Sequence, residues 1–389
     1  MKGTLIVKKS LALPPLALAA ALCAAEPSAR IPARGLVLDA PGTNFRVADF
    51  TRDPVGPKDV LIEILYSGIC HSDIHAALND GGGDPTKTFP IVPGHEIVGR
   101  VTQVGAEVAS FKVGDIAGVG CFVDSCGACD QCGLGREQFC RNRDPQPNRL
   151  RDGRNFRGGY SNRVVVPERN AIHIPAGADL KRVPPLLCAG VTVWSPIHAS
   201  KVKKGDKVGV AGFGGLGHMA VKYLVALGAE VTVFDVTDAK RDDALRLGAK
   251  RYVNVRGPNP WEGMEDSFDF ILSTIPAADY RVGDYLRLVR YDGGEMAVVG
   301  LPPGLKIGLG ELMAAPHRRL YGSIVGGIRE HQACMDWSLA HGVLPETVVI
   351  PATPEAVAKA YQDVIDGKVR FRYVLDLATL PKDRRKEPP

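Results

Sequence analysis

The sequence lacks a strong excess of charge of either sign. Its 48 Lys and Arg residues and 43 Asp and Glu residues leave a formal net charge of +5 over 389 residues. The basic residues are scattered, apart from a short run at 382–386 that we interpret as a solvated chain end. A nucleic-acid-binding protein is expected to carry a basic face or stripe. The sequence therefore gives no indication of a nucleic-acid partner.

The sequence also lacks an apolar run long enough to span a membrane comfortably. The apolar run at residues 11–25 contains two prolines and falls short of the roughly 20 residues that a spanning helix needs. Lys2, Lys8 and Lys9 precede it and small residues end it, as is typical of a signal peptide. Residues 1–33 are therefore either a targeting segment or an extension ahead of a cytosolic protein. We expect no membrane partner and a cytoplasmic location, with export or organelle targeting as the alternative.

Four of the nine cysteines are grouped closely in the sequence. Cys126, Cys129, Cys132 and Cys140 follow the pattern C-x2-C-x2-C-x7-C, which favours one tetrahedral Zn²⁺ over two unstrained disulfides. A closed four-cysteine site has no open coordination position, so we predict a structural zinc here. A disulfide knuckle or chance clustering is the alternative. Cys121, just upstream, is predicted to be a buried strand residue outside the metal sites.

Three further residues form a candidate catalytic zinc set. Cys70 lies in Gly-Ile-Cys-His-Ser-Asp-Ile-His, His95 in Pro-Gly-His-Glu, and Cys188 in Leu-Leu-Cys-Ala-Gly. Two cysteines and one histidine leave the fourth zinc position open for water or substrate. Each residue alone is a weak indication, because a lone cysteine in an apolar stretch is usually a core residue. Their order relative to the four-cysteine cluster and to a downstream glycine loop supports the set.

The chain is longer than one hydrophobic core usually organises, and its patterns indicate two domains. Residues 34–186 carry short β-type runs between Gly and Pro turns, which predicts a strand-dominated domain. Residues 187–327 alternate strands and helices, which predicts a Rossmann-type doubly wound parallel sheet and the α/β class. Residues 328–389 contain two helical stretches and a final strand. The strands predicted in the parallel sheet are 207–211, 231–234, 251–255, 268–272 and 295–299.

The parallel domain opens on a glycine-rich loop directly after an apolar strand. Gly212, Gly214 and Gly217 follow the pattern GxGxxG, with Gly215 and Leu216 between them, and a helical pattern follows. The glycines allow the backbone to approach a pyrophosphate at the helix N-terminus, where free N–H groups and the helix dipole favour anions. We therefore predict that these five residues bind a dinucleotide.

The turn after the second strand bears on which nicotinamide cofactor binds. Asp235 ends that strand, where a carboxylate accepts hydrogen bonds from ribose hydroxyls and repels a 2′-phosphate. Asp235 therefore favours NAD. Thr237, Lys240 and Arg241 offer a hydroxyl and two cations to a 2′-phosphate, so NADP is the alternative. Lys240 and Arg241 are interpreted equally well as exposed charges on a helix.

Together these motifs resemble those of zinc-dependent medium-chain alcohol dehydrogenases. The narrower resemblance is to cinnamyl alcohol dehydrogenases and broad-range bacterial aldehyde reductases, and it covers roughly residues 34–378. The segments that carry it, besides the four-cysteine cluster, are 68–75, 93–99, 118–127, 158–161 and 186–196. The resemblance implies a GroES-like first domain that the C-terminal residues return to complete. It also implies a homodimer or a homotetramer.

The resemblance implies a reaction and roles for three side chains of residues 68–75. A zinc ion polarises an aldehyde oxygen or binds an alcohol, and a hydride moves directly between the substrate carbon and the nicotinamide. Ser72 contacts the substrate oxygen and His75 continues the proton relay. His71 lies near the cofactor pyrophosphate. The expected small-molecule substrates are primary alcohols and aldehydes, aromatic or of medium chain length.

Further side chains are expected around the open zinc. Glu96 follows His95 and is predicted to lie near the zinc, as a catalytic residue or a transient ligand. Asp73 is predicted to orient His95 through its second ring nitrogen. Trp194 is predicted to line an apolar substrate pocket, with an ordinary core position as the alternative.

Two charged residues depart from the family pattern, and two other classes of protein stay open. Arg157 and Arg329 either narrow substrate choice toward acidic or polar compounds or face solvent.

A zinc-free quinone or enoyl reductase of the same fold would lack the ligand set of Cys70, His95 and Cys188. A non-catalytic dinucleotide-binding protein would have little use for a complete open ligand set.

Overall fold

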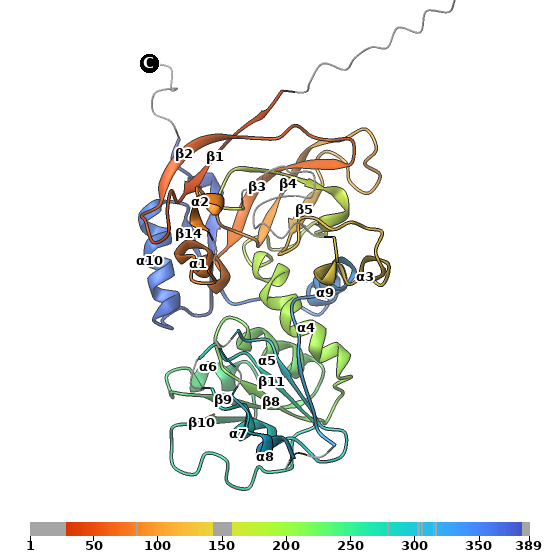
Figure 1. The fold of residues 1–389 in the computed structure, drawn as a ribbon, viewed down its shortest axis with the longest axis vertical. Coiled ribbons are helices and arrows are strands. Elements are labelled where there is room, and N and C mark those ends of the chain that lie inside the picture. The colour runs from red at the N-terminus through yellow and green to blue at the C-terminus, as the bar shows by residue number, and fades with distance from the viewer. Residues whose placement is uncertain are drawn as a thin grey trace, which may run out of the picture.

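The computed structural model describes residues 29–382 except 83, 143–157, 278–279, 302–303, 305, 314 and 316. The chain forms two lobes, a β-rich lobe and a lobe built on a parallel sheet (Figure 1). Helix α4 (Ala189–Ala199) lies where the lobes meet and packs against α5 (Gly217–Ala226) and α9 (Ile328–Ala340). The predicted α/β class, with a Rossmann-type sheet and a GroES-like domain, is confirmed.

The β-rich lobe is organised by a seven-stranded sheet of order β14-β15-β3-β4-β5-β7, in which β6 also pairs with β3. Its strands are β3 Asp59–Gly68, β4 Ile97–Val104, β5 Ile116–Val119, β6 Arg163–Pro167, β7 Ala171–His173, β14 Thr347–Pro351 and β15 Arg372–Asp376. A separate antiparallel pair is formed by β1 Ile31–Val37 and β2 Arg46–Arg52. The helices of this lobe besides α9 are α1 His71–Leu78, α2 Pro85–Thr88, α3 Asp130–Gly133 and α10 Pro354–Ile365.

The C-terminal residues return to this sheet. Strand β15 pairs antiparallel with β3, with Val374 opposite Gly68, and β14 pairs parallel with β15. Helix α10 begins at Pro354, and the Thr353 side chain accepts a hydrogen bond from the Ala356 amide at 3.3 Å, which satisfies an N-terminal donor of the helix. The end of the chain therefore supplies a strand beside the one that leads to Cys70.

The second lobe has a six-stranded, fully parallel sheet of order β10-β9-β8-β11-β12-β13. Its strands are β8 Lys207–Ala211, β9 Glu230–Asp235, β10 Arg251–Asn254, β11 Phe270–Ser273, β12 Glu295–Val298 and β13 Arg319–Gly322. Its helices besides α4 and α5 are α6 Arg241–Arg246, α7 Val282–Leu286 and α8 Leu309–Met313. This strand order reverses between β8 and β11, and ligands of such sheets bind outside the carboxyl ends at that point.

Three clusters of buried apolar side chains support the two sheets. One fills the β-rich lobe around β3 and β4, and another covers one face of the parallel sheet around Phe234 and Ile271. The third runs from the β-rich lobe through α4 to the other face of the parallel sheet. Within the described part of the chain, no helix has the length and apolar character needed to cross a membrane.

Candidate active site

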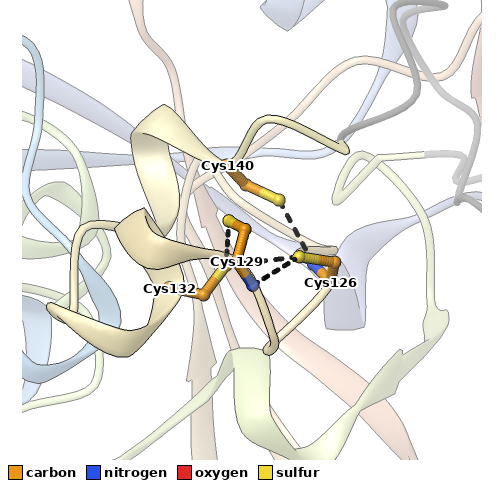
Figure 2. A group of neighbouring side chains, drawn as sticks. All are labelled: Cys126, Cys129, Cys132 and Cys140. Atoms are coloured by element: carbon orange, nitrogen blue, oxygen red, sulfur yellow. Dashed lines mark hydrogen bonds between the residues drawn. The ribbon is translucent and has the colours of Figure 1, made fainter.

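Four cysteine side chains come together in the loop around α3 (Figure 2). The Cys129 and Cys132 sulfurs lie 3.6 Å apart and those of Cys126 and Cys132 lie 3.8 Å apart. Four Zn–S bonds of about 2.3 Å in a tetrahedron place their sulfurs about 3.8 Å apart, whereas a disulfide bond is about 2.05 Å long. The four side chains, which include Cys140, therefore fit one zinc ion and form no disulfide.

Backbone N–H groups point to the sulfurs of this cluster and stabilise their negatively charged form. The amide N–H of Cys129 points to the Cys126 sulfur at 3.3 Å, and that of Cys126 points to the Cys140 sulfur at the same distance. Hydrogen bonds from the Ala128 and Cys129 amides lower the pKa of Cys126 to about 6. A thiolate is the form of cysteine that binds metal, so these amides favour zinc binding.

The three residues of the predicted open set also meet. Cys70 lies just before α1, His95 just before β4, and Cys188 just before α4. The Cys70 and Cys188 sulfurs lie 3.9 Å apart, and ligand atoms of Cys70, His95, Glu96 and Cys188 all lie within 4.8 Å of one another. Cys70 and Cys188 are buried, and their separation matches that expected for two thiolates on one zinc ion. The donor set therefore fits a zinc ion with room for a further ligand.

Asp73 organises the residues around this set. Its Oδ1 lies 2.9 Å from His95 Nδ1 and accepts a hydrogen bond from the Gly94 amide, while its Oδ2 accepts one from the Cys70 amide. The Tyr160 hydroxyl donates to the same Oδ2 at 3.3 Å. Because Asp73 engages Nδ1, the other ring nitrogen of His95 is left for a metal. Tyr160 was not predicted, since nothing in the sequence relates it to Asp73.

Glu96 lies beside the open set and is paired with an arginine from the C-terminal strand. Arg372 donates a hydrogen bond to Glu96 Oε1, and both residues are buried. Burial raises the pKa of Glu96 to about 7, against the opposing charge of Arg372. Glu96 Oε2 has no hydrogen-bond partner among the described residues. A Cβ atom on Gly68 would lie 1.9 Å from this oxygen, so residue 68 must be glycine.

A cavity of about 450 Å³ opens beside His95. Ser72 and His75 of α1 line it, and Asp80 Oδ2 lies 2.7 Å from His75 Nδ1. Both Ser72 and His75 are exposed. The rings of His71 and His75 lie 4.9 Å apart on the same helix. One side of α1 therefore presents a hydroxyl and imidazoles between the metal set and solvent.

Cys121 corrects one prediction. It was expected to be a buried strand residue, but β5 ends at Val119 and Cys121 is partly exposed in a bend that lines the cavity. The preceding residue, Gly120, has no room for a side chain, because a Cβ atom there would lie 2.8 Å from the Leu187 carbonyl oxygen and 2.9 Å from His331. A hydrogen bond with Cys188 lowers the pKa of Cys121.

Trp194 and Arg329 each take one of the two positions that the sequence left open: Trp194 lies in the core and Arg329 is exposed. The Trp194 indole is 4% exposed in the core cluster that runs through α4, stacked on His198 and tilted against Trp337, and so does not line the cavity. Arg329 is exposed at the start of α9 and points to the Gly133 carbonyl oxygen of the cysteine loop, at 3.5 Å. Arg157 lies outside the described residues.

The glycine loop has the shape that a dinucleotide needs. Gly212 has a φ of 88°, and a Cβ atom on Gly217 would lie 2.0 Å from the Gly212 carbonyl oxygen, so both positions need glycine. Gly214 has open space where its Cβ atom would stand. Gly215 lies against Arg372, and Leu216 immediately precedes α5. The helix begins at Gly217, so its N-terminal amides face the switch point of the sheet.

The other predicted cofactor residues stand at the end of β9. Asp235 is its last residue, and its carboxylate accepts a 2.7 Å hydrogen bond from the Val236 amide. Burial raises the pKa of Asp235. Lys240 immediately precedes α6, and its ammonium lies 5.5 Å from the centre of the Phe371 ring. Arg241 pairs with Asp238.

Comparisons with known proteins agree with this geometry. Residues 56–176 match the family described as alcohol dehydrogenase GroES-like domain, and residues 215–340 match the one described as zinc-binding dehydrogenase. NADP-dependent alcohol dehydrogenase C 1 of Mycolicibacterium smegmatis is 44% identical over 333 residues, which cover 85% of this chain and 93% of that protein. Aldehyde reductase YahK of Escherichia coli is 40% identical over 85% of this chain and 94% of its own length.

A solved structure gives the same result. The structure of CAD from Helicobacter pylori complexed with NADP(H) has a TM-score of 0.82 and 44% sequence identity, covering 90% of this chain and 99% of that one. The sequence similarity spans both domains. The chain therefore belongs to the family of zinc-binding, NAD(P)-dependent alcohol dehydrogenases.

Proposed function

We propose that this chain interconverts primary alcohols and aldehydes, with two zinc ions per chain and NADP(H) as the preferred cofactor. Residues 34–186 and 328–389 form the catalytic domain in this proposal, and residues 187–327 form the cofactor domain. The observation that carries the proposal is the meeting of Cys70, His95 and Cys188 beside a cavity. A zinc-free reductase of the same fold or a non-catalytic dinucleotide-binding protein would not need such a set.

The bound groups would supply the electrophile and the hydride, because zinc polarises a carbonyl oxygen and the nicotinamide carries the hydride. The protein residues would position the substrate and transfer protons. Ser72 is placed to hydrogen-bond the substrate oxygen, and His75, held by Asp80, passes a proton toward solvent. The glycine loop and the N-terminus of α5 hold the pyrophosphate, while Arg372 links this loop to Glu96.

The choice of NADP(H) reverses the expectation drawn from Asp235. The M. smegmatis relative is named NADP-dependent, and the H. pylori structure contains NADP(H). Both cover most of the chain at 44% identity, which supports NADP over NAD. The relatives therefore favour the alternative that Thr237, Lys240 and Arg241 offered over the preference for NAD drawn from Asp235.

The cavity supports an apolar substrate. Its volume of about 450 Å³ lies in the range of small-molecule sites, and Ile91, Val92 and Val123 contribute to its wall. Among the residues that the structure describes, no arginine or lysine lines it. Aromatic or medium-length aldehydes are therefore the proposed substrate class.

Two further parts of the proposal concern the protein as a whole. Strand β13 lies at the edge of the parallel sheet, and the nearby Leu309 and Met313 of α8 are 72% and 73% exposed, which supports a homodimer, with a homotetramer as the alternative. A monomeric mass in light scattering would contradict both. A cytoplasmic location is supported by the two thiolate sites, which suit a reducing compartment.

The function is tested by turnover and zinc content together. We expect the purified protein to contain about two zinc ions per chain and to reduce benzaldehyde, cinnamaldehyde and hexanal with NADPH. Cys188→Ser should lose the open-site zinc and this activity. Cys334→Ser is the matched control, since Cys334 is equally buried but bonds to Tyr223 and belongs to neither metal set. An active Cys188→Ser enzyme would overturn the catalytic zinc assignment.

A further inference from the structure

Three consecutive residues before and at the start of β15 connect the catalytic domain to the cofactor domain. Arg372 bonds Glu96 and lies against Gly215 of the glycine loop. Phe371 stacks on the His218 ring at 4.8 Å with an interplanar angle of 6°, and its edge meets Phe213 at 5.1 Å. Phe371 is 2% exposed, so this segment is firmly held. Its remaining member, Arg370, is thereby directed to the turn after β9.

Arg370 contacts that turn directly. Its Nη2 donates a hydrogen bond to the Ala239 carbonyl oxygen at 3.1 Å, and its Nη1 pairs with Asp243 of α6. Lys240, next to Ala239, places its ammonium 5.5 Å from the centre of the Phe371 ring. Two cations from different domains therefore lie together at the carboxyl end of β9.

This position is where a Rossmann-type sheet receives the adenosine ribose. Burial lowers the pKa of Lys240, while the Asp235 charge raises it and the Arg370 charge lowers it further. Asp235, Lys240 and Arg370 are thus close enough to influence one another. The carboxylates of Asp235 and Asp243 face three cations, Lys240, Arg370 and Arg246, which leaves one net positive charge for a ligand that approaches the ribose 2′ position.

Arg370 can bind a ligand without leaving the partly buried carboxylate of Asp243 unpaired. Asp243, its present partner, also accepts a hydrogen bond from Arg246 at 3.3 Å. If Arg370 turns to a phosphate, Arg246 still neutralises Asp243. The Arg370 side chain is also 52% exposed, which leaves it room to reorient.

We propose that Arg370 and Lys240 bind the 2′-phosphate of NADP(H), and that Arg370, supplied by the catalytic domain, determines cofactor selectivity. This inference deepens the proposed function, on which its reference to NADP(H) rests. The guanidinium group suits a phosphate because its N–H groups form paired, charge-assisted hydrogen bonds. It explains how a chain with Asp235 at the end of β9 accepts a 2′-phosphate.

A binding measurement tests the inference without any turnover. Adenosine 2′,5′-bisphosphate and adenosine 5′-monophosphate differ only in the 2′-phosphate, and both can be titrated into the zinc-loaded, full-length protein by calorimetry at fixed ionic strength. We expect Arg370→Gln to weaken binding of the bisphosphate by about tenfold to a hundredfold. Binding of the monophosphate should change less than about twofold, which also shows that the variant is folded.

Lys250→Gln is the matched control, because it removes an exposed cation of the same domain that pairs with Glu230 rather than with Asp243. It should leave binding of both nucleotides unchanged. Arg370→Lys should recover part of the bisphosphate affinity, and Lys240→Gln should lose it as Arg370→Gln does. The inference is overturned if Arg370→Gln weakens both nucleotides equally or weakens neither.

The same variants separate this inference from the proposed function. If the wild-type protein binds the bisphosphate through Arg370 but reduces none of the tested aldehydes, the proposed function fails and the phosphate site stands. If the wild type reduces aldehydes and Arg370→Gln keeps the same ratio of kcat/KM for NADPH and NADH, the phosphate site fails and the function stands. The expected result is a fall of about tenfold or more in that ratio.

Discussion

The two candidate metal sites of this chain are assembled in opposite ways. The four-cysteine cluster comes from one segment, Cys126–Cys140, and its longest sulfur-to-amide link joins residues 14 positions apart. The open set joins Cys70 to Cys188, which lie 118 positions apart, and its neighbour Glu96 is held by Arg372 from 276 positions away. The first site is therefore a local structure, and the second exists only when the whole chain is folded.

Because of this difference, we expect the two sites to have different roles. A local loop gains its order from the metal itself, because binding energy and folding energy are then the same quantity. The open set is held in place by β3, the loop before β4, and α4, so the metal adds little to the fold there. We infer that the closed site determines stability and the open site determines chemistry.

Cys132→Ser should lower the stability of the protein more than the other substitutions that we propose, because it removes a ligand from the closed site. Structural zinc contributes about 10 kcal/mol or more to the folding of small zinc domains, so we expect a loss of about 5 kcal/mol or more of unfolding free energy. Zinc content should fall by about one ion per chain. Differential scanning calorimetry and metal analysis would measure both quantities.

Cys334→Ser serves as the control for Cys132→Ser, because Cys334 is fully buried outside both metal sets. It should cost only about 1–3 kcal/mol, as is usual for a core substitution. If Cys132→Ser unfolds no more easily than Cys334→Ser, the closed site is not the main stabilising metal site.

Chelation should separate the two sites without a mutation. The open position of the catalytic set lets a small chelator reach the metal, whereas four thiolates close the other site. With increasing chelator, we expect activity to fall about a thousandfold with the loss of the first zinc ion, before the unfolding temperature changes. Parallel assays of activity, zinc content and melting would show the order. Loss of stability before loss of activity would contradict the assignment.

The same contrast explains what the sequence could predict. The four-cysteine cluster was recognisable from spacing alone, and strand β8 coincides with the predicted run 207–211 because short-range patterns determine both. The strand predicted at 268–272 begins two residues later, at Phe270, because Phe268 instead bridges to Val289. The open set was recognisable only from the order of its three motifs relative to that cluster and to the glycine loop, because each residue alone is a weak indication.

Residues that act across long distances were missed. Tyr160, Arg370 and Arg372 reach their partners through the pairing of β15 with β3 and through the contact between domains, and no local pattern marks them. Trp194 was misplaced because its position six residues after Cys188 suggested the pocket, whereas the turn of α4 directs its ring into the core. Side-chain direction on a helix depends on what packs against it.

Asp73→Asn tests whether the open site depends on a residue that holds its ligands in position through hydrogen bonds. The carboxylate accepts hydrogen bonds from two backbone amides and lies 2.9 Å from His95 Nδ1. The asparagine side chain keeps one acceptor oxygen. It places an NH₂ donor where the other carboxylate oxygen faced backbone or imidazole N–H groups. We expect zinc affinity at the open site or kcat/KM to fall about tenfold to a hundredfold. Asp366→Asn, at an exposed position after α10, is the control and should change neither. Equal zinc affinity and activity in both variants would contradict the role of Asp73.

Glu137→Gln should have the smallest effect, and it tests whether the two sites communicate. Glu137 lies within the four-cysteine loop, and its Oε2 accepts a 3.0 Å hydrogen bond from the Ile328 amide at the N-terminus of α9. The same helix carries His331, which packs against Gly120 beside the open site. Glutamine keeps the hydrogen-bond acceptor but removes the charge that favours a helix N-terminus.

We expect Glu137→Gln to lower the unfolding free energy by about 0.3–1 kcal/mol, with zinc content unchanged. Glu355→Gln removes a similar charge at an exposed position in the first turn of the comparable helix α10 and should cost the same. Only Glu137→Gln should also raise the KM for aldehyde, because Glu137 holds the helix that places His331 against Gly120, whereas Glu355 belongs to neither metal set. If the two variants differ neither in stability nor in KM, the closed site supports its own loop alone.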